Sequence, residues 1–176
     1  MTGATSQIDP IRQMALKWYY QELWGPDFGD IDEIGVEEFK EAQIIFLKSL
    51  LVAANGDGKV TPKERQWVIG RGAVAGVPES ILKELENYPA DEDITELIAR
   101  TVPNQKSGRG VIYFAINAAA SDGEYNEGEK ATIRKVAQAL GISEEVVQEI
   151  ENLYLEEQRV KEKRIALCLP DGSPFE

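Results

Sequence analysis

The 176-residue sequence contains no histidine, a single cysteine and no long apolar run. Without histidine the chain lacks the commonest general base, the usual transition-metal ligand, and the Ser–His and Cys–His nucleophile pairs. The lone Cys168 cannot form a disulfide within the chain, and we expect it to be a small packing residue. No apolar run approaches the ~20 residues that cross a membrane, and the first residues lack a signal-peptide pattern. The sequence therefore predicts a cytoplasmic protein without membrane insertion.

Positive charge is also scarce. Nineteen Lys and Arg residues face 31 Asp and Glu residues, so the formal net charge is −12. Nucleic-acid binding requires clustered Lys and Arg, and anionic membrane surfaces repel an acidic protein. Both are therefore excluded as partners, and the natural counterparts are cations and basic protein surfaces.

The sequence pattern predicts helices along the whole chain. Asp9-Pro10 is typical of a helix start and Gly25-Pro26 of a helix end, so a first helix carrying Trp18, Tyr19 and Trp24 is expected between them. Apolar residues then recur at helical spacing from about 36 to 55, and a short helix is expected at 93–100. Nothing alternates with period two for long enough to form a sheet, so the predicted fold class is all-α.

The chain contains an internal duplication. Residues 50–85 and 115–150 align without a gap at an offset of 65, with apolar positions in phase. The identical pairs are Ala53/Ala118, Ala54/Ala119, Asp57/Asp122, Gly58/Gly123, Glu64/Glu129, Gly76/Gly141, Glu79/Glu144 and Glu84/Glu149. Two units are too few for a solenoid, so we expect a helical-bundle domain whose two repeats pack face to face about an approximate two-fold axis.

Each repeat is predicted to be a helix, an Asp-Gly turn and a second helix. Thr61-Pro-Lys-Glu64 has the sequence of a capping box, and Asn126-Glu-Gly-Glu129 repeats it with Asn as the cap. A third helix follows each second helix, short over 78–87 and long from 143 to about 164. Gly70 and Gly72 lie inside the second helix of the first repeat, where they either permit close packing or bend the segment.

The Asp-Gly turns are similar to the second half of an EF-hand loop. Residues 57–64 and 122–129 place Asp, Gly and Glu at the fifth, sixth and twelfth loop positions. The first position should be Asp, but it is Ala53 in one repeat and Ala118 in the other. Without that ligand, ordinary calcium binding of the EF-hand type is not expected.

The pattern resembles the TerB-like family of bacterial tellurite resistance proteins. Its motif is an Ala-rich helix, an Asp-Gly turn, a Glu that opens the next helix and a closing Gly-hydrophobic pair. Here it occurs as Ala53–Glu64 with Gly76-Val77, and again as Ala118–Glu129 with Gly141-Ile142. The match covers about residues 36–155. We therefore divide the chain into an aromatic helix and acidic linker (1–34), a TerB-like duplicated domain (35–169) and a tail (170–176).

The resemblance implies a role in the response to tellurite or chemical stress, with a divalent cation (Ca²⁺ or Mg²⁺) bound by acidic residues. By position, the candidate metal ligands are Asp57, Glu64, Asp122 and Glu129. The competing interpretation is structural, because a Glu at the third helical position reaches back to the cap amide and an Asp before Gly forms a turn.

The expected function is that of a non-catalytic acidic scaffold. The alternative is a metal-free protein–protein interaction module anchored by Trp18, Tyr19, Trp24 or Trp67. Both imply a protein partner, with a homodimer as one form of the interaction. An enzyme is not expected, because nothing singles out a catalytic pair among the 31 acids and no cofactor motif is present.

Overall fold

The computed structural model describes residues 10–27, 36–101 and 107–175. Within these ranges the chain forms helices and no strands, which confirms the predicted all-α class. The elements in chain order are α1 (Pro10–Trp24), α2 (Val36–Ala54), the 3-10 turn η2 (Asn55–Asp57), α3 (Pro62–Val74), α4 (Glu79–Glu86), α5 (Ile94–Thr101), α6 (Gly108–Ala119), the 3-10 turn η4 (Ala120–Asp122), α7 (Glu127–Ala139) and α8 (Glu144–Cys168).

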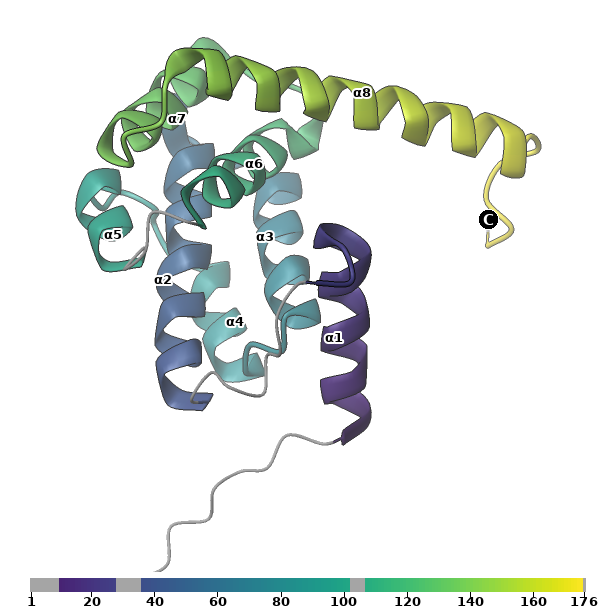
Figure 1. Cartoon of the computed structure of the whole chain (residues 1–176), viewed down its shortest axis with the longest axis horizontal. Helices are drawn as coiled ribbons and strands as arrows, with labels where there is room; N and C mark the ends of the chain where they lie inside the picture. The colour runs from purple at the N-terminus through teal and green to yellow at the C-terminus, as the bar shows by residue number, and fades with distance from the viewer. Residues whose placement is uncertain (1–9, 28–35, 102–106, 176) are drawn as a thin grey trace, which may run out of the picture.

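The two repeats are visible in this order. The first consists of α2, η2, α3 and α4, and the second consists of α6, η4, α7 and α8. The leading helices α2 and α6 pack against each other at the centre of the molecule (Figure 1). Leu47 and Leu50 on α2, like Ile112 and Ile116 on α6, are completely buried. The hydrophobic core is therefore built on the pair of helices that precede the Asp-Gly turns.

Each turn packs against the other repeat. The turn η2 contacts α7, and η4 contacts α3. This exchange is reciprocal, as the expected approximate two-fold relation between the repeats requires. The two corners with the acidic motif consequently lie side by side.

One of the two interior glycines of α3 permits close packing. The helix runs through both of them without interruption. A Cβ on Gly72 would lie 2.6 Å from Cδ1 of Leu47 and 2.9 Å from Cδ2 of Leu82, whereas a Cβ on Gly70 would meet nothing within 4 Å. Gly72 therefore lets α3 approach α2 and α4, and of the two predicted alternatives close packing holds.

The helix α1 packs on both repeats through its side chains, against α3 of the first and α6 of the second. Leu16 and Tyr20 are buried, and the ring of Trp24 packs edge-on against Tyr113 and Phe114 of α6 at centroid distances of 5.7 and 5.6 Å. Trp18, by contrast, is exposed over 64% of its surface. The aromatic face of this helix is thus divided between the core and the solvent.

The last helix leaves the body of the molecule (Figure 1). Val147 and Glu151 are buried, and Nη1 of Arg134 lies 3.1 Å from Oε1 of Glu151. From residue 159 to 175 every residue is exposed, and we call residues 159–168 the α8 arm. Cys168 is exposed at its end, so the predicted packing role of this cysteine is wrong. In the described part of the chain, no helix is long and apolar enough to cross a membrane.

Candidate functional site at the paired Asp-Gly corners

The two aspartates of the motif hold their turns. Oδ1 of Asp57 accepts a hydrogen bond from the amide of residue 59 at 3.0 Å, and Oδ1 of Asp122 accepts one from the amide of residue 124 at 2.9 Å. Gly58 and Gly123 follow with φ of +90° and +100°, a conformation that favours glycine. Both corners therefore have the same geometry, which the repeated Asp-Gly sequence predicts.

The two glutamates of the motif close capping boxes. The amide of Thr61 donates to Oε2 of Glu64 at 2.6 Å, and the amide of Glu64 donates back to the Thr61 hydroxyl at 3.3 Å. In the second repeat, the amide of Asn126 donates to Oε2 of Glu129 at 2.8 Å, and the Glu129 amide donates to Oδ1 of Asn126 at 3.1 Å. The predicted reach-back to the cap amide is confirmed in both repeats.

These two glutamates also meet each other. Both are only 2% exposed, and they lie close enough together for each carboxyl group to affect the pKa of the other. Burial raises the pKa of Glu129 to about 7, with further contributions from the charges of Glu64 and Asp57. Burial likewise raises the pKa of Glu64, and Asp122 adds to the effect. Two buried like charges cannot both ionise cheaply, so this pair of carboxyl groups retains a proton at pH values below the raised pKa of about 7.

The backbone brings the corners into direct contact. A Cβ on Gly56 would lie 2.6 Å from the backbone of Glu129, and a Cβ on Gly128 would lie 2.6 Å from the carbonyl oxygen of Gly56. Beside them, Nδ2 of Asn126 donates to Oδ2 of Asp57 at 3.1 Å and joins the two repeats. Glycine is thus needed here because no side chain fits between the repeats.

This arrangement does not form a metal shell. Each glutamate already gives an oxygen to a cap amide, and each aspartate gives one to its turn. Among the residues that the structure describes, no three Asp, Glu or Cys side chains are grouped so that they could hold a metal ion. The structure gathers Asp57, Glu64, Asp122 and Glu129 in one region, and cation binding by them stays a prediction.

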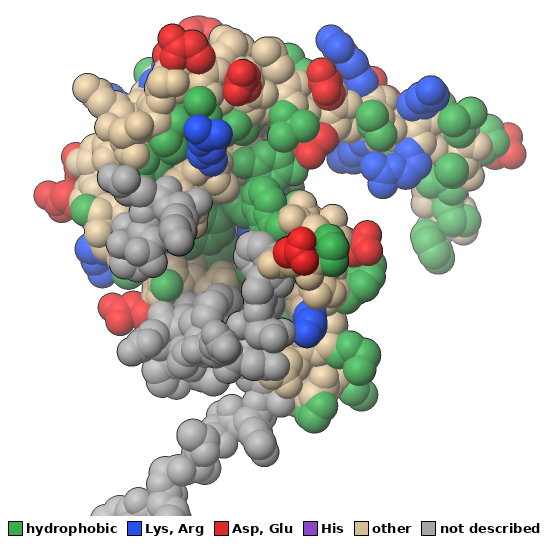
Figure 2. All heavy atoms as spheres, in the orientation of Figure 1, with side chains coloured by type: hydrophobic (Ala, Val, Ile, Leu, Met, Phe, Trp, Pro, Cys, Tyr) green, Lys and Arg blue, Asp and Glu red, His purple; other side chains and the backbone are tan. Residues whose placement is uncertain are grey.

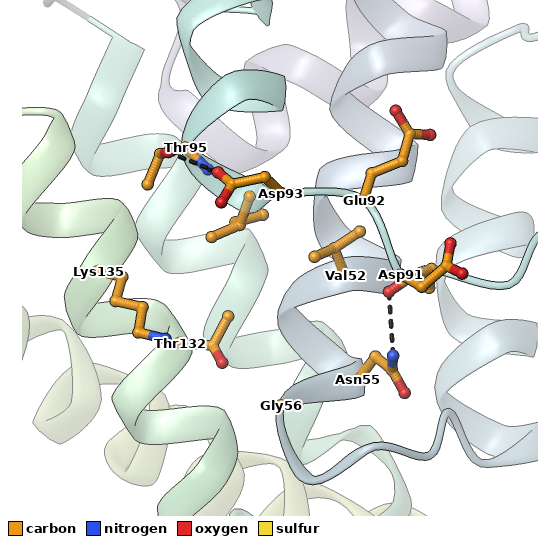
Figure 3. Close-up of a pocket in the computed structure, with 11 residues that line it drawn as sticks. Val52, Asn55, Gly56, Asp91, Glu92, Asp93, Thr95, Thr132 and Lys135 are labelled. Atoms are coloured by element: carbon orange, nitrogen blue, oxygen red, sulfur yellow. Dashed lines mark hydrogen bonds between the residues drawn. The ribbon is translucent and has the colours of Figure 1, made fainter.

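A polar pocket of about 410 Å³ opens beside the first corner (Figure 3). Asn55 and Gly56 form one side, Thr132 and Lys135 of α7 another, and the acidic segment 91–93 the third. Nδ2 of Asn55 donates to the carbonyl oxygen of Ala90 at 3.0 Å and fixes that segment. Two of its three carboxylates have partners within the protein, because Glu92 accepts from the Tyr88 hydroxyl at 2.7 Å and Asp93 caps α5.

Two features of this site could not be predicted from the sequence. One is the contact between the two glutamates, since each repeat read alone explains its own glutamate as a cap. The other is the close approach of Gly56 and Gly128, which lie 72 positions apart in the numbering and do not correspond within the repeats. The low side-chain volume of both positions was the one available signal.

Comparisons with known proteins identify similar sequences and a similar fold. A family described as "Tellurite resistance protein TerB" matches residues 71–152. A solved structure of a tellurite resistance protein from Nostoc punctiforme is 35% identical, with a TM-score of 0.78, and the match covers 95% of this chain and 99% of that one. A search of curated proteins gives no match. The similarity thus extends well beyond the segment matched by the family.

Proposed function

The chain belongs to the TerB family of tellurite resistance proteins, and from this membership we propose that it acts as a non-catalytic acidic scaffold in the response to tellurite or chemical stress. In this role it binds a protein partner in the cytoplasm and does not itself transform tellurite. The one thiol, Cys168, supplies too few electrons for such a reduction.

The main support for this proposal is that the motif carboxylates are engaged in hydrogen bonds within the protein. Glu64 and Glu129 are buried and hydrogen-bonded to their own cap amides, and Asp57 and Asp122 hold their own turns. A catalytic carboxylate must instead reach a substrate. The motif therefore builds the junction between the repeats, and function falls to the exposed surfaces.

The α8 arm is the exposed surface best suited to a partner. It carries Arg159, Lys161, Lys163 and Arg164 in a chain of net charge −12. The arm is exposed on all sides and offers apolar side chains such as Val160 and Leu167 beside its charges. Opposite charges on one molecule suit a partner that has both acidic and basic patches.

The alternative function, a metal-free interaction module, draws support from α1. Ile11, Met14 and Trp18 are spaced by three and four residues, so they lie on one face of this helix, and they are exposed over 75, 71 and 64% of their surfaces. Such a stripe is typical of a helix that docks in a partner's groove. Trp67, the other predicted anchor, is partly buried against the core.

Tellurite tolerance tests the scaffold proposal. A tellurite-sensitive bacterium would express the full chain, a chain ending after Gln158, or Trp18→Ala. We expect the full chain to raise the tolerated concentration and the shortened chain to lose this effect. Loss with Trp18→Ala alone would instead favour the α1 alternative. Reduction of tellurite by the purified protein would contradict a non-catalytic role.

Calorimetric titration with Ca²⁺, Mg²⁺ and Mn²⁺ tests the cation separately. If the four carboxylates bind a cation, Glu64→Gln must abolish the heat, whereas Glu127→Gln, an exposed acid at the start of α7, must leave it unchanged. No heat with any of the three ions would reject cation binding and leave the scaffold proposal intact.

A further inference from the structure

A buried arginine lies apart from the acidic corners. Arg71 on α3 is only 9% exposed, and its guanidinium lies among aromatic rings from three other helices. Its Cζ is 3.6 Å from the ring centroid of Phe114, 5.6 Å from that of Phe46 and 5.8 Å from that of Tyr19. The guanidinium is therefore held against the ring of Phe114.

One edge of this guanidinium is left without a partner. Nη1 donates to the Tyr19 hydroxyl at 2.6 Å. Nε is buried and has no hydrogen-bond partner, and no ion pair among the described residues includes Arg71. The Nε–Nη2 edge, the fork that arginine uses to hold two oxygens at once, is thus unused by the described part of the protein.

The fold does not require a charge at this position. At the repeat offset of 65, the counterpart of Arg71 is Val136, which is 1% exposed and packs in the apolar core under α5. Among the described residues this buried guanidinium has no counter-charge, and the aromatic contacts and one hydrogen bond offset only part of the cost of burying it. An anion on the open edge would supply the missing charge.

We propose that Arg71 is the receptor for a small oxyanion, held by two parallel hydrogen bonds from Nε and Nη2. The ligand class is an inorganic oxyanion or a small carboxylate, because both present two oxygens at the spacing of the fork. Figure 2 shows a hollow lined by hydrophobic side chains between α6 and α1, the helices that supply Phe114 and Tyr19 to Arg71. The aromatic rings around the guanidinium offer a larger polar ligand few hydrogen bonds, which favours a compact anion.

The helix α1 is the cover of this site. It contributes Tyr19 to the guanidinium and rests on the body through side chains such as Leu16 and Trp24. The site is independent of the proposed scaffold function, because none of its residues belongs to the Asp-Gly corners or the α8 arm.

Nuclear magnetic resonance of the arginine Nε–H groups tests the site directly. The Arg71 signal is assigned by its absence in Arg71→Lys, and the full chain is titrated with sodium formate, sodium sulfate or sodium chloride at constant ionic strength. We expect formate, sulfate or both to shift the Arg71 signal saturably while chloride does not. The formate and sulfate arms separate a carboxylate site from an inorganic oxyanion site. A titration that moves all arginine signals alike, or none, would overturn the proposal.

The melting temperature supplies a second readout. Sulfate stabilises many proteins without binding, so the comparison is between wild type, Arg71→Met and Arg109→Gln, an exposed arginine on α6. The rise in melting temperature with the anion should be as large in Arg109→Gln as in wild type, and in Arg71→Met it should fall to the part that needs no binding. In Arg71→Lys, which keeps the charge but loses the fork, the apparent affinity should fall by about 10- to 100-fold. Equal rises in wild type and Arg71→Met would contradict the site.

Discussion

The two repeats differ most in how they end. After α4 the first repeat turns and α5 packs back on α2 and α7, whereas in the second repeat α8 continues as one helix of 25 residues. In α5 the residues Ile94, Leu97 and Ile98 are buried. At the repeat offset their counterparts in the α8 arm are Arg159, Glu162 and Lys163, all exposed. A helix folds back where one face is apolar and extends into solvent where that face is charged.

In the second repeat, α1 packs at the position that corresponds to α5 in the first repeat. As α5 packs against α2 and α7, so α1 lies against their repeat counterparts α6 and α3, through Trp24 on Phe114 and Tyr19 on Arg71. The N-terminal helix thus completes the second repeat. The same position, Val136 under α5 and Arg71 under α1, is apolar in one case and charged in the other.

The largest difference between the repeats is expected at these last helices. Leu97→Ala should lower the free energy of unfolding by about 3 kcal/mol, because it opens a cavity under α5. Glu162→Ala, its counterpart in the α8 arm, should change it by less than about 0.5 kcal/mol. Urea denaturation of both variants measures the two changes in the free energy of unfolding. Similar losses would mean that the arm packs on the body in solution.

The contact between the corners should be the next most sensitive feature. Gly56→Ala places a methyl group against the backbone of Glu129 and should cost about 2 kcal/mol. Gly70→Ala is the matched control, because its methyl group meets open space within a helix and should stabilise by about 1 kcal/mol. If thermal unfolding shows that Gly56→Ala and Gly70→Ala change the stability in the same direction, the close approach of the repeats is wrong.

The retained proton predicts a dependence of stability on pH. Because the pKa of Glu129 rises from 4.5 to about 7 on folding, the folded state holds a proton that the unfolded state has released. Stability from this group is therefore present below pH 4.5 and lost as the pH rises through 7. Glu129→Gln keeps the cap and mimics the protonated acid at every pH.

The variant should therefore match wild type near pH 5 and exceed its free energy of unfolding at pH 8 by on the order of 1–2 kcal/mol. Denaturant titrations at the two pH values measure this. Glu127→Gln is the control, because Lys130 lowers the pKa of that exposed acid and the shift has the opposite direction. If the difference in free energy of unfolding between Glu129→Gln and wild type is the same at pH 5 and at pH 8, the proposed retention of a proton by the pair is wrong.

The caps should show the smallest difference. Thr61 caps its own helix, whereas Asn126 caps α7 and also donates to Asp57 of the other repeat. Thr61→Ala should cost about 1 kcal/mol. Asn126→Ala should cost about 1 kcal/mol more, because it also removes the hydrogen bond between the repeats. Equal losses in chemical denaturation would show that this bond contributes nothing.

Much of the fold could be predicted from the sequence. The gapless repeat, the capping boxes and the Asp-Gly turns are local signals, and each fixed an element near its observed bounds. Contacts between segments distant in sequence could not be read in this way. Neither the pairing of Glu64 with Glu129 nor the cover of α1 over Arg71 has a local signature, because both depend on how the repeats pack.

For the candidate site, too, local signals could be predicted from the sequence and contacts between distant segments could not. The structure places the four motif residues in one region, because the packing of the repeats brings equivalent corners together. Their hydrogen bonds to cap and turn amides match the structural interpretation, and cation binding by them remains a prediction. In the sequence, Arg71 differs from its repeat counterpart Val136 and lies between two glycines, but nothing local indicates that it is buried. Its burial depends on the position of α1.

The junction of the repeats through two buried carboxyl groups is tested most directly by following those groups. Carbon-13 labelling of the glutamate side chains allows the protonation of Glu64 and Glu129 to be titrated by nuclear magnetic resonance. Assignment would use Glu64→Gln and Glu129→Gln. We expect one proton to remain on the pair up to about pH 7 and the two signals to respond together. Independent titration of both groups near pH 4.5 would contradict the account.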